Sequence, residues 1–354
     1  MIDFRYHVVS IVAIFLALTV GLVIGASILS KGVADSLRSD LSTRNDQIKS
    51  QQNQINQLKT QIDQQDKYLN ATAGQLVSGR LSGLCVALVE IAGADSDAYA
   101  GLRAMVQKQS DATICSETMI SASLSTTSSP DQQQTMAALI AEHTPTGQKL
   151  TGSVAQQSME LIGEALTTYQ AAGATPATVN PTGTATATPT KTPATGSTAT
   201  AGSTSSSGVM TAGQALGTLR DYQSAGFITI LTQPVTGEQA ALAYVQAPGT
   251  ANADADNQTY IALAEALRKG GAGTVVGGSG DSAAKGGLVY AIIADSTATR
   301  LISTVDNTDV TMGQVASVFC LEAESQATAA GSSGHYGTGA NNDGPLPPIA
   351  SGAN

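Results

Sequence analysis

The sequence predicts an α/β protein in which a mostly parallel sheet, covered by helices on both faces, follows a membrane helix and a long coiled-coil helix. Three patterns predict this organisation. Residues 8–29 form an uncharged apolar run, apolar residues then recur at every seventh position, and short apolar runs alternate with helical segments from residue 79 onward. The first pattern is typical of a membrane helix, the second of a coiled coil, and the third of an α/β sheet.

The apolar run from Val8 to Leu29 predicts a transmembrane anchor. It holds 22 residues without a charge, and at about 1.5 Å per residue a helix of that length crosses a hydrocarbon core of roughly 30 Å. The alternative is a cleaved secretory signal, whose apolar region is usually about 7–15 residues long and ends at an A-x-A-like site. The run is longer and no such site closes it, so we expect a retained single-pass anchor.

Four small residues recur at every fourth position of this run and form one ridge along the helix: Ala13, Ala17, Gly21 and Gly25. Such a ridge lets two backbones approach closely, which predicts self-association in the membrane. The alternative is that glycine and alanine are simply frequent in membrane helices.

Residues 33–77 predict a coiled-coil helix, because no Pro or Gly occurs from Val33 to Ala73 and one heptad position is apolar throughout. The expected seam consists of Leu41, Ile48, Ile55, Leu58, Ile62, Leu69 and Leu76. The other seam position also carries Arg44, Gln51, Gln65 and Thr72, so the coiled coil is weaker than a leucine zipper. We expect a parallel homodimer; the alternative is that this helix packs against its own globular domain.

The membrane orientation is predicted from composition, because Arg5 on one side of the anchor and Lys31, Arg38 and Arg44 on the other leave charge counting undecided. Only 12% of residues are charged, and a Thr/Pro tract is typical of extracytoplasmic stalks. We therefore place residues 1–7 in the cytoplasm and the main domain outside the cell membrane. The net charge of −10 argues against nucleic acid as a partner.

Residues 80–173 and 209–327 predict the two parts of one α/β domain, because strand-like and helix-like segments alternate in both. We expect a Rossmann-like, mostly parallel sheet. The expected strands are 84–89, 113–120, 227–231, 241–245, 274–276 and Arg300 to Val305. The expected helices are 97–109, 130–142, 154–169, 213–222, 259–269 and 312–325.

Two segments have the composition of loops. Residues 174–208 hold 12 Thr, 5 Ser and 4 Pro with one charge, so they cannot bury a core and are expected to be disordered. Because only two expected strands precede this segment, we interpret it as an insertion into one domain rather than a linker between two. Residues 328–354 form a Gly/Pro-rich tail.

Catalytic motifs are sparse, so we expect no enzyme. Histidine occurs three times, and no G-x-S-x-G, H-E-x-x-H, C-x-x-C or P-loop string is present. The best candidate ligand or partner loop comprises Ser303, Thr304, Asp306 and Asn307, because it ends an expected strand, where α/β sheets place ligands. The alternative is that Asp306 and Asn307 only shape the loop. Thr311 and Gln314 have capping-box spacing for the next helix.

The sulfur-containing residues leave a metal site undefined. Cys85 and Cys115 lie in two expected strands that can be neighbours, which permits a disulfide outside the cytoplasm, although parallel-strand disulfides are uncommon. Cys320 lies in an expected helix. Met105, Cys115, Met119 and Met136 are scattered without a repeated motif, which favours core positions over a copper site. We expect no resident cofactor.

Two separated stretches resemble the actinobacterial MctB family. The first is Phe4-Arg5-Tyr6-His7-Val8-Val9-Ser10 and the apolar residues after it. The second is Ser303-Thr304-Val305-Asp306-Asn307, a helix, Gly334-His335-Tyr336-Gly337 and Leu346-Pro347-Pro348, in the order of that family's C-terminal signature. The resemblance implies copper homeostasis or export, while a related branch called SteB implies an envelope scaffold that acts in cell separation through the membrane protein SteA and peptidoglycan hydrolases.

Two functional hypotheses therefore stand side by side. One is a membrane-anchored component of copper homeostasis, which the family name favours. The other is a SteB-like scaffold with a SteA-like partner, which the self-associating anchor and the long helix favour. A clustered Met/Cys site is the feature that favours the first hypothesis over the second.

Overall fold

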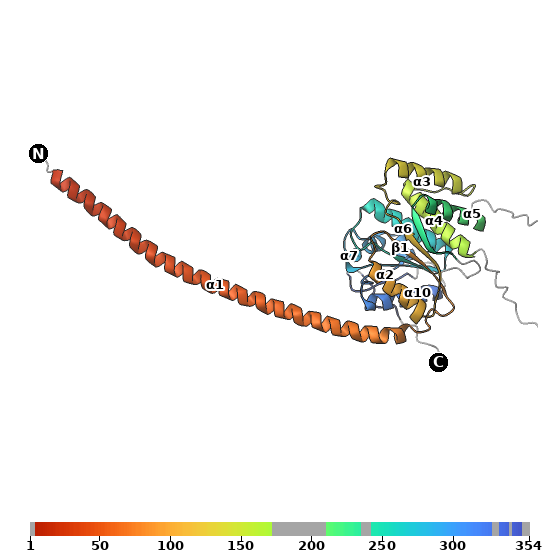
Figure 1. Cartoon of the computed structure of the whole chain (residues 1–354), viewed down its shortest axis with the longest axis horizontal. Helices are drawn as coiled ribbons and strands as arrows, with labels where there is room; N and C mark the ends of the chain where they lie inside the picture. Colours follow the sequence, from red (N-terminus) through yellow and green to blue (C-terminus); the bar gives the residue numbers. More distant parts are fainter. Residues whose placement is uncertain (1–3, 172–209, 235–241, 328–332, 340–341, 349–354) are drawn as a thin grey trace, which may run out of the picture. The chain divides into compact units, whose positions relative to one another are not determined.

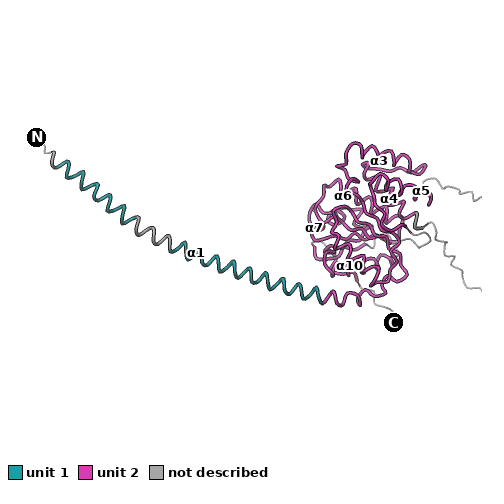
Figure 2. Tube along the Cα trace, in the orientation of Figure 1, with its two compact units in different colours: residues 1–67 teal, residues 68–354 magenta. Residues whose placement is uncertain are grey.

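The computed structural model describes residues 4–171, 210–234, 242–327, 333–339 and 342–348. The chain divides into two compact units, residues 1–67 and residues 68–354 (Figure 2). The segment expected to be a disordered insertion, residues 174–208, lies outside the described residues. Parts of the expected tail, residues 328–354, are described and are treated below with the sheet.

The chain begins with one helix, α1, which runs from Phe4 to Val77 over 74 residues. Its segment Tyr6–Gly25 is the one described helical segment that is long and apolar enough to cross a membrane. An N-terminal apolar helix of this length fits a membrane anchor. The same helix continues through the heptad region, so the two predicted helical segments belong to one continuous element.

A seven-stranded sheet forms the centre of the second unit (Figure 1). Its spatial order is β3-β2-β1-β4-β5-β6-β7, and every neighbouring pair is parallel except β2 with β3. Strands from both sides of residues 174–208 share this sheet, so one domain contains both parts. The strands are β1 Cys85–Ile91, β2 Thr113–Ile120, β3 Ile228–Thr232, β4 Leu242–Gln246, β5 Gly273–Gly277, β6 Ser303–Val305 and β7 His335–Tyr336.

Helices cover both faces of the sheet, as the sequence predicts. The end of α1, α2 Ser96–Ala104, the π-helix η1 Met105–Gln109 and α10 Thr311–Gln326 contribute to the core on one face. The other face carries α3 Pro130–His143, α4 Val154–Ala171, α5 Ala212–Ser224, α6 Asp254–Gly270, α8 Leu288–Ala294 and α9 Ala298–Leu301. The four-residue helix α7 Gly280–Ala283 follows β5.

Strand β4 illustrates how the sheet separates two cores. Leu242 and Tyr244 join the cluster under α2 and α10, whereas Ala243 and Val245 join the cluster under α6. All five residues of this central strand are buried. Because side chains alternate across a strand, a strand that is buried on both faces is apolar at nearly every position, which is why it was recognisable from the sequence.

The last turns of α1 pack onto the domain that follows. Ala73 and Val77 are buried in the core that includes α2 and α10, and Thr311 Oγ1 donates a hydrogen bond of 2.6 Å to Asn70 Oδ1. Leu69 and Leu76 belong to the predicted coiled-coil seam, which is a different stripe of the helix from Ala73 and Val77. Leu76 is 45% exposed. The end of the helix therefore contacts its own domain with one face while part of the predicted seam faces solvent.

Three local predictions are wrong or incomplete. The expected strand Arg300 to Val305 begins as helix α9, because Asp295 Oδ1 accepts hydrogen bonds from the amides of Thr297 and Ala298 and starts a helical turn. Thr311 is not an N-cap: Val310 precedes the helix and its side chain makes no capping bond. The expected tail contains β7, which pairs in parallel with β6.

Cys85 and Cys115 are joined by a disulfide between β1 and β2, with their Cα atoms 5.6 Å apart. A bulge makes this parallel-strand bridge possible. Val86 pairs with Ile114 and Ala87 with Ser116, so Cys115 is an extra residue in its strand. Bulges redirect side chains, and here the bulge brings the second thiol towards the first.

Candidate functional site

The segment that the sequence singles out, Ser303 to Asn307, consists of strand β6 itself, Ser303–Val305, and the first two residues after it, and all of it is buried. Ser303 Oγ donates to Glu324 Oε1 on α10, and the Thr304 hydroxyl lies 2.9 Å from His335 Nδ1. Asn307 adopts a left-handed backbone with φ 58°. The structure brings all four predicted residues together, but their polar atoms contact the protein rather than an open cleft.

Asp306 holds the segment after β7. Its Oδ1 accepts a hydrogen bond of 2.6 Å from the amide of Thr338, and its Oδ2 accepts one of 2.7 Å from the amide of Gly339. A Cβ atom at Gly337, whose φ is +134°, would collide with this carboxylate. Asp306 therefore shapes the loop, and glycine at 337 is required both by the backbone angle and by the close approach.

His335 is buried between β6 and α9, where its Nε2 lies 2.8 Å from the hydroxyl of Thr299. Burial lowers the pKa of this imidazole below its ordinary value, against smaller opposing effects of the Thr299 carbonyl and Asp343. Leu346 packs against the core under α10. The separated stretches of the C-terminal signature thus form one contiguous edge of the domain.

The crevice where the strand order reverses, between β1 and β4, is bridged by backbone. Ala94 and Pro248, from the loops after these strands, form an antiparallel bridge, and the amide of Gly249 donates to the Gly93 carbonyl at 2.9 Å. Open α/β sheets usually bind ligands at this position. Here the two loops hydrogen-bond to each other across it.

An acidic cavity of about 430 Å³ lies between α4 and α6, beside the start of α9. Glu160, Glu265 and Asp295 line it, together with Lys269. Desolvation by burial raises the pKa of Glu160 and of Glu265, and Asp295 adds to the rise at Glu265. The cavity favours cations by charge, although the structure shows no further group that fixes a ligand there.

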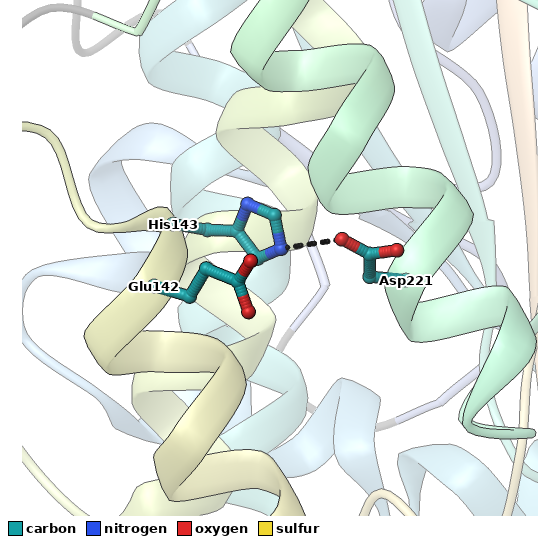
Figure 3. Close-up of side chains that lie close together, drawn as sticks. All are labelled: Glu142, His143 and Asp221. Carbon is teal, nitrogen blue, oxygen red and sulfur yellow. Dashed lines mark hydrogen bonds and ion pairs between the residues drawn. The ribbon is translucent and has the colours of Figure 1, made fainter.

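A mixed nitrogen and oxygen cluster lies on the outer helices of the same face (Figure 3). Glu142 and His143 end α3, and Asp221 lies on α5 with its Oδ2 3.0 Å from His143 Nε2. One ligand atom from each residue lies within 4.8 Å of the other two. No pattern in the sequence indicates this cluster, because Asp221 is 78 residues from His143 and the Glu-His pair alone matches no metal motif.

The four sulfur-containing residues weighed above as copper ligands lie in different parts of the described domain. Met105 belongs to the core on the α10 side of the sheet and Met136 to the core on the opposite side. Cys115 is in the disulfide, and Met119 is partly exposed. Cys320 is a buried free thiol whose pKa is raised by burial and by Glu324.

The predicted self-association surfaces of α1 are exposed. A Cβ atom built at Gly21 or Gly25 meets nothing within 4 Å, so the ridge with Ala13 and Ala17 is open along the described helix. Five seam residues between Leu41 and Ile62 are 44–62% exposed. Their exposure leaves these side chains free to contact a partner helix, and the coiled coil itself stays a prediction.

The family comparison covers nearly the whole chain. A family model described as "Copper transport outer membrane protein, MctB" matches residues 1–347. The chain belongs to the MctB family. The match includes the apolar start of α1 and the C-terminal signature as far as Pro347, so the resemblance predicted from those short stretches is confirmed over residues 1–347.

Mycobacterial members of the MctB family are similar along their full length. A protein of Mycobacterium tuberculosis (strain ATCC 25618 / H37Rv) named "Copper transporter MctB" is 26% identical over 341 residues, which are 96% of this chain and 97% of that protein. A protein of Mycobacterium leprae (strain TN) with the same name is 27% identical over 343 residues, with the same coverage.

Proposed function

We propose that this chain is a non-enzymatic, single-pass, membrane-anchored envelope protein that acts in copper homeostasis or copper export. The observation that carries the proposal is membership of the MctB family over residues 1–347. It is supported by full-length relatives named as copper transporters. The main domain lies outside the cell membrane in this proposal, and the copper ion is cargo rather than a resident cofactor.

The chain acts as a component of a larger assembly rather than as a channel by itself. One apolar helix among the described residues cannot enclose a path for an ion. The exposed ridge and seam of α1 support a parallel homodimer, because both copies begin in the same membrane. Such a dimer holds two α/β domains on one membrane face, where they can contact a partner.

The proposal is tested by measuring cell-associated copper. A strain that lacks the gene is grown with sub-lethal added copper and compared with the same strain complemented by the intact chain. Export predicts a reproducible rise in copper per cell that complementation reverses. Equal copper in both strains, with the complementing protein shown to be present in the membrane, contradicts a primary role in copper export.

The second candidate is a SteB-like scaffold that acts with a SteA-like membrane protein on cell separation. The apolar residues Ile48, Ile55 and Ile62 favour it, because they lie exposed in one stripe of a long helix and offer a surface for protein contact. The same strain distinguishes the two functions. A scaffold predicts chained or unseparated cells under the microscope with unchanged copper, whereas copper homeostasis predicts the reverse.

A further inference from the structure

The cluster at the junction of α3 and α5 has the composition of a divalent metal site. His143 supplies an imidazole nitrogen, and Glu142 and Asp221 each supply a carboxylate oxygen (Figure 3). We propose that Glu142, His143 and Asp221 bind a divalent copper ion. The choice of copper over other divalent ions rests on the proposed function, whereas the ligand set stands on the geometry alone.

The distance between two of the ligand atoms already allows both to bind one shared metal ion. His143 Nε2 and Asp221 Oδ2 are 3.0 Å apart. Two donors at about 2.0–2.1 Å from one ion and at a right angle lie about 2.9 Å from each other. An ion therefore replaces the direct contact of the pair with little movement of either helix. The third donor, on Glu142, lies within 4.8 Å, a distance that rotation of its flexible side chain closes.

The charges of the cluster also favour a cation. Two carboxylates surround one imidazole, and the carboxylate of Glu142 has no hydrogen-bond or ion-pair partner among the described residues. The imidazole of His143 is held firmly, because its side chain is only 10% exposed. Asp221 is 47% exposed, so an ion can enter from solvent. A divalent ion neutralises the negative charge of the carboxylates and replaces the contact between His143 and Asp221 with coordination by both side chains.

The donor types select the oxidation state. Imidazole and carboxylate suit divalent copper in tetragonal geometry, with water in the remaining positions, whereas monovalent copper prefers thiolate and thioether ligands. Among the described cysteines, Cys85 and Cys115 form a disulfide and Cys320 is a buried thiol, so the cluster contains no thiolate. The proposed site therefore takes the oxidised ion. At equal ligand geometry divalent copper also binds more tightly than the divalent zinc that competes for such donors.

The test uses the full chain purified in detergent micelles, with copper(II) chloride as the probe. Affinity is measured by competition with a chromophoric chelator, and ligand identity by low-temperature electron paramagnetic resonance. His143→Gln, Glu142→Gln and Asp221→Asn remove one donor each. Glu160→Gln is the matched acidic control, because Glu160 lines the cavity beside α6, and His7→Gln controls for another imidazole.

We expect one copper ion per chain, a signal from a single nitrogen donor, and a loss of affinity of at least about tenfold in each of the three variants. The two controls are expected to bind as the intact chain does. Glu142→Gln distinguishes a loss of copper binding from a loss of folding, because an exposed side chain without a partner can be changed without disturbing α3. Unchanged affinity in Glu142→Gln and His143→Gln, or a nitrogen signal that persists in His143→Gln, overturns the site.

Failure of the site and failure of the proposed function give different results. If the three variants lose copper but the deletion strain keeps normal copper, the site is real and copper export is wrong. If the deletion strain accumulates copper but His143→Gln restores normal levels and binds copper normally, export stands and this site is wrong.

Discussion

Arg80 joins the end of α1 to α10 through Phe319. The guanidinium carbon of Arg80 lies 4.0 Å from the centroid of the Phe319 ring. Its Nη1 donates to Glu322 Oε2 at 2.7 Å, and its Nε donates to the Leu76 carbonyl at 2.8 Å. One side chain thus satisfies a carbonyl at the C-terminus of α1, an acidic partner and an aromatic face.

Replacing this arginine is expected to weaken the domain. Arg80→Ala loses a cation–π contact and a partly buried ion pair, and should lower the free energy of unfolding by about 1–2 kcal/mol. Urea unfolding of the full chain can be followed by tyrosine fluorescence, because the chain has 9 Tyr and no Trp. Arg38→Ala, at an exposed position of α1, is the control. Equal urea midpoints for both variants would refute the role of Arg80.

The Asp306 carboxylate is predicted to hold the segment after β7 in place. Asp306→Asn keeps the size of the side chain but loses the charge and one of the two acceptors, and should cost about 1–3 kcal/mol of stability. Hydrogen exchange should accelerate at the amides of Thr338 and Gly339. Asp309→Asn, at a neighbouring exposed position, should change neither. Slow exchange retained in Asp306→Asn would show that the segment is held by other contacts.

Long, strongly patterned elements could be predicted from the sequence, and elements defined by tertiary contacts could not. The strand from Thr113 to Ile120 has the predicted bounds, because β-branched residues, which favour strands, occupy four of its eight positions. The two residues of β7 carry no strand signal, since their pairing depends on β6. The direction of β3 was equally hidden: a short strand has the same alternation whether its neighbour is parallel or antiparallel.

The candidate site shows the same limit. The sequence placed Ser303 to Asn307 at the end of a strand, whereas Ser303 to Val305 are the whole of β6 and only Asp306 and Asn307 follow it. The burial of these residues is visible only in the fold. The expected start of that strand is helical instead, and the Asp295 carboxylate, which accepts from the amides of Thr297 and Ala298, holds the turn that leads into α9. The pairing of His143 with Asp221 depends on the packing of α3 against α5, to which no spacing in the sequence points.

The buried His335 predicts a loss of stability on acidification. Desolvation lowers the pKa of His335 in the folded chain, so the unfolded chain binds its proton first as the pH falls. The stability that this histidine contributes is therefore present above about pH 6.5 and is lost as the pH falls through the lower folded value.

His335→Gln isolates this effect. The variant should be less stable near pH 7.5, because it loses contacts with the Thr299 and Thr304 hydroxyls. The difference in unfolding free energy between the two proteins should shrink between pH 6.5 and pH 5, by at most about 1.4 kcal/mol per pH unit. The measurement is urea unfolding at a series of pH values. A constant difference over this range would exclude His335 as the responsible group.

The seam of α1 is predicted to pair with the same residues of a second copy. Ile55→Cys should form a disulfide-linked dimer under mild oxidation in native membranes, because identical seam positions face each other in a parallel, in-register coiled coil. Asn53→Cys is the matched control, since its position lies on the outer face of the same heptad. Equal cross-linking at both positions would indicate random collision, and none at either would argue against the dimer.

The disulfide gives a test of membrane orientation as well as of stability. Cys85 and Cys115 are 30 residues apart, and closing a loop of this size typically stabilises a domain by about 2–4 kcal/mol. Structural disulfides persist outside the cytoplasm. Chain isolated from cells under acid quench should therefore resist alkylation until it is unfolded, after which one thiol, Cys320, reacts before reduction and three react after it. Three reactive thiols before reduction would place the domain in the cytoplasm and overturn the proposed location. The contribution of the bridge to stability is tested separately with Cys115→Ser. Unchanged stability in that variant would show that the bridge is dispensable for the fold.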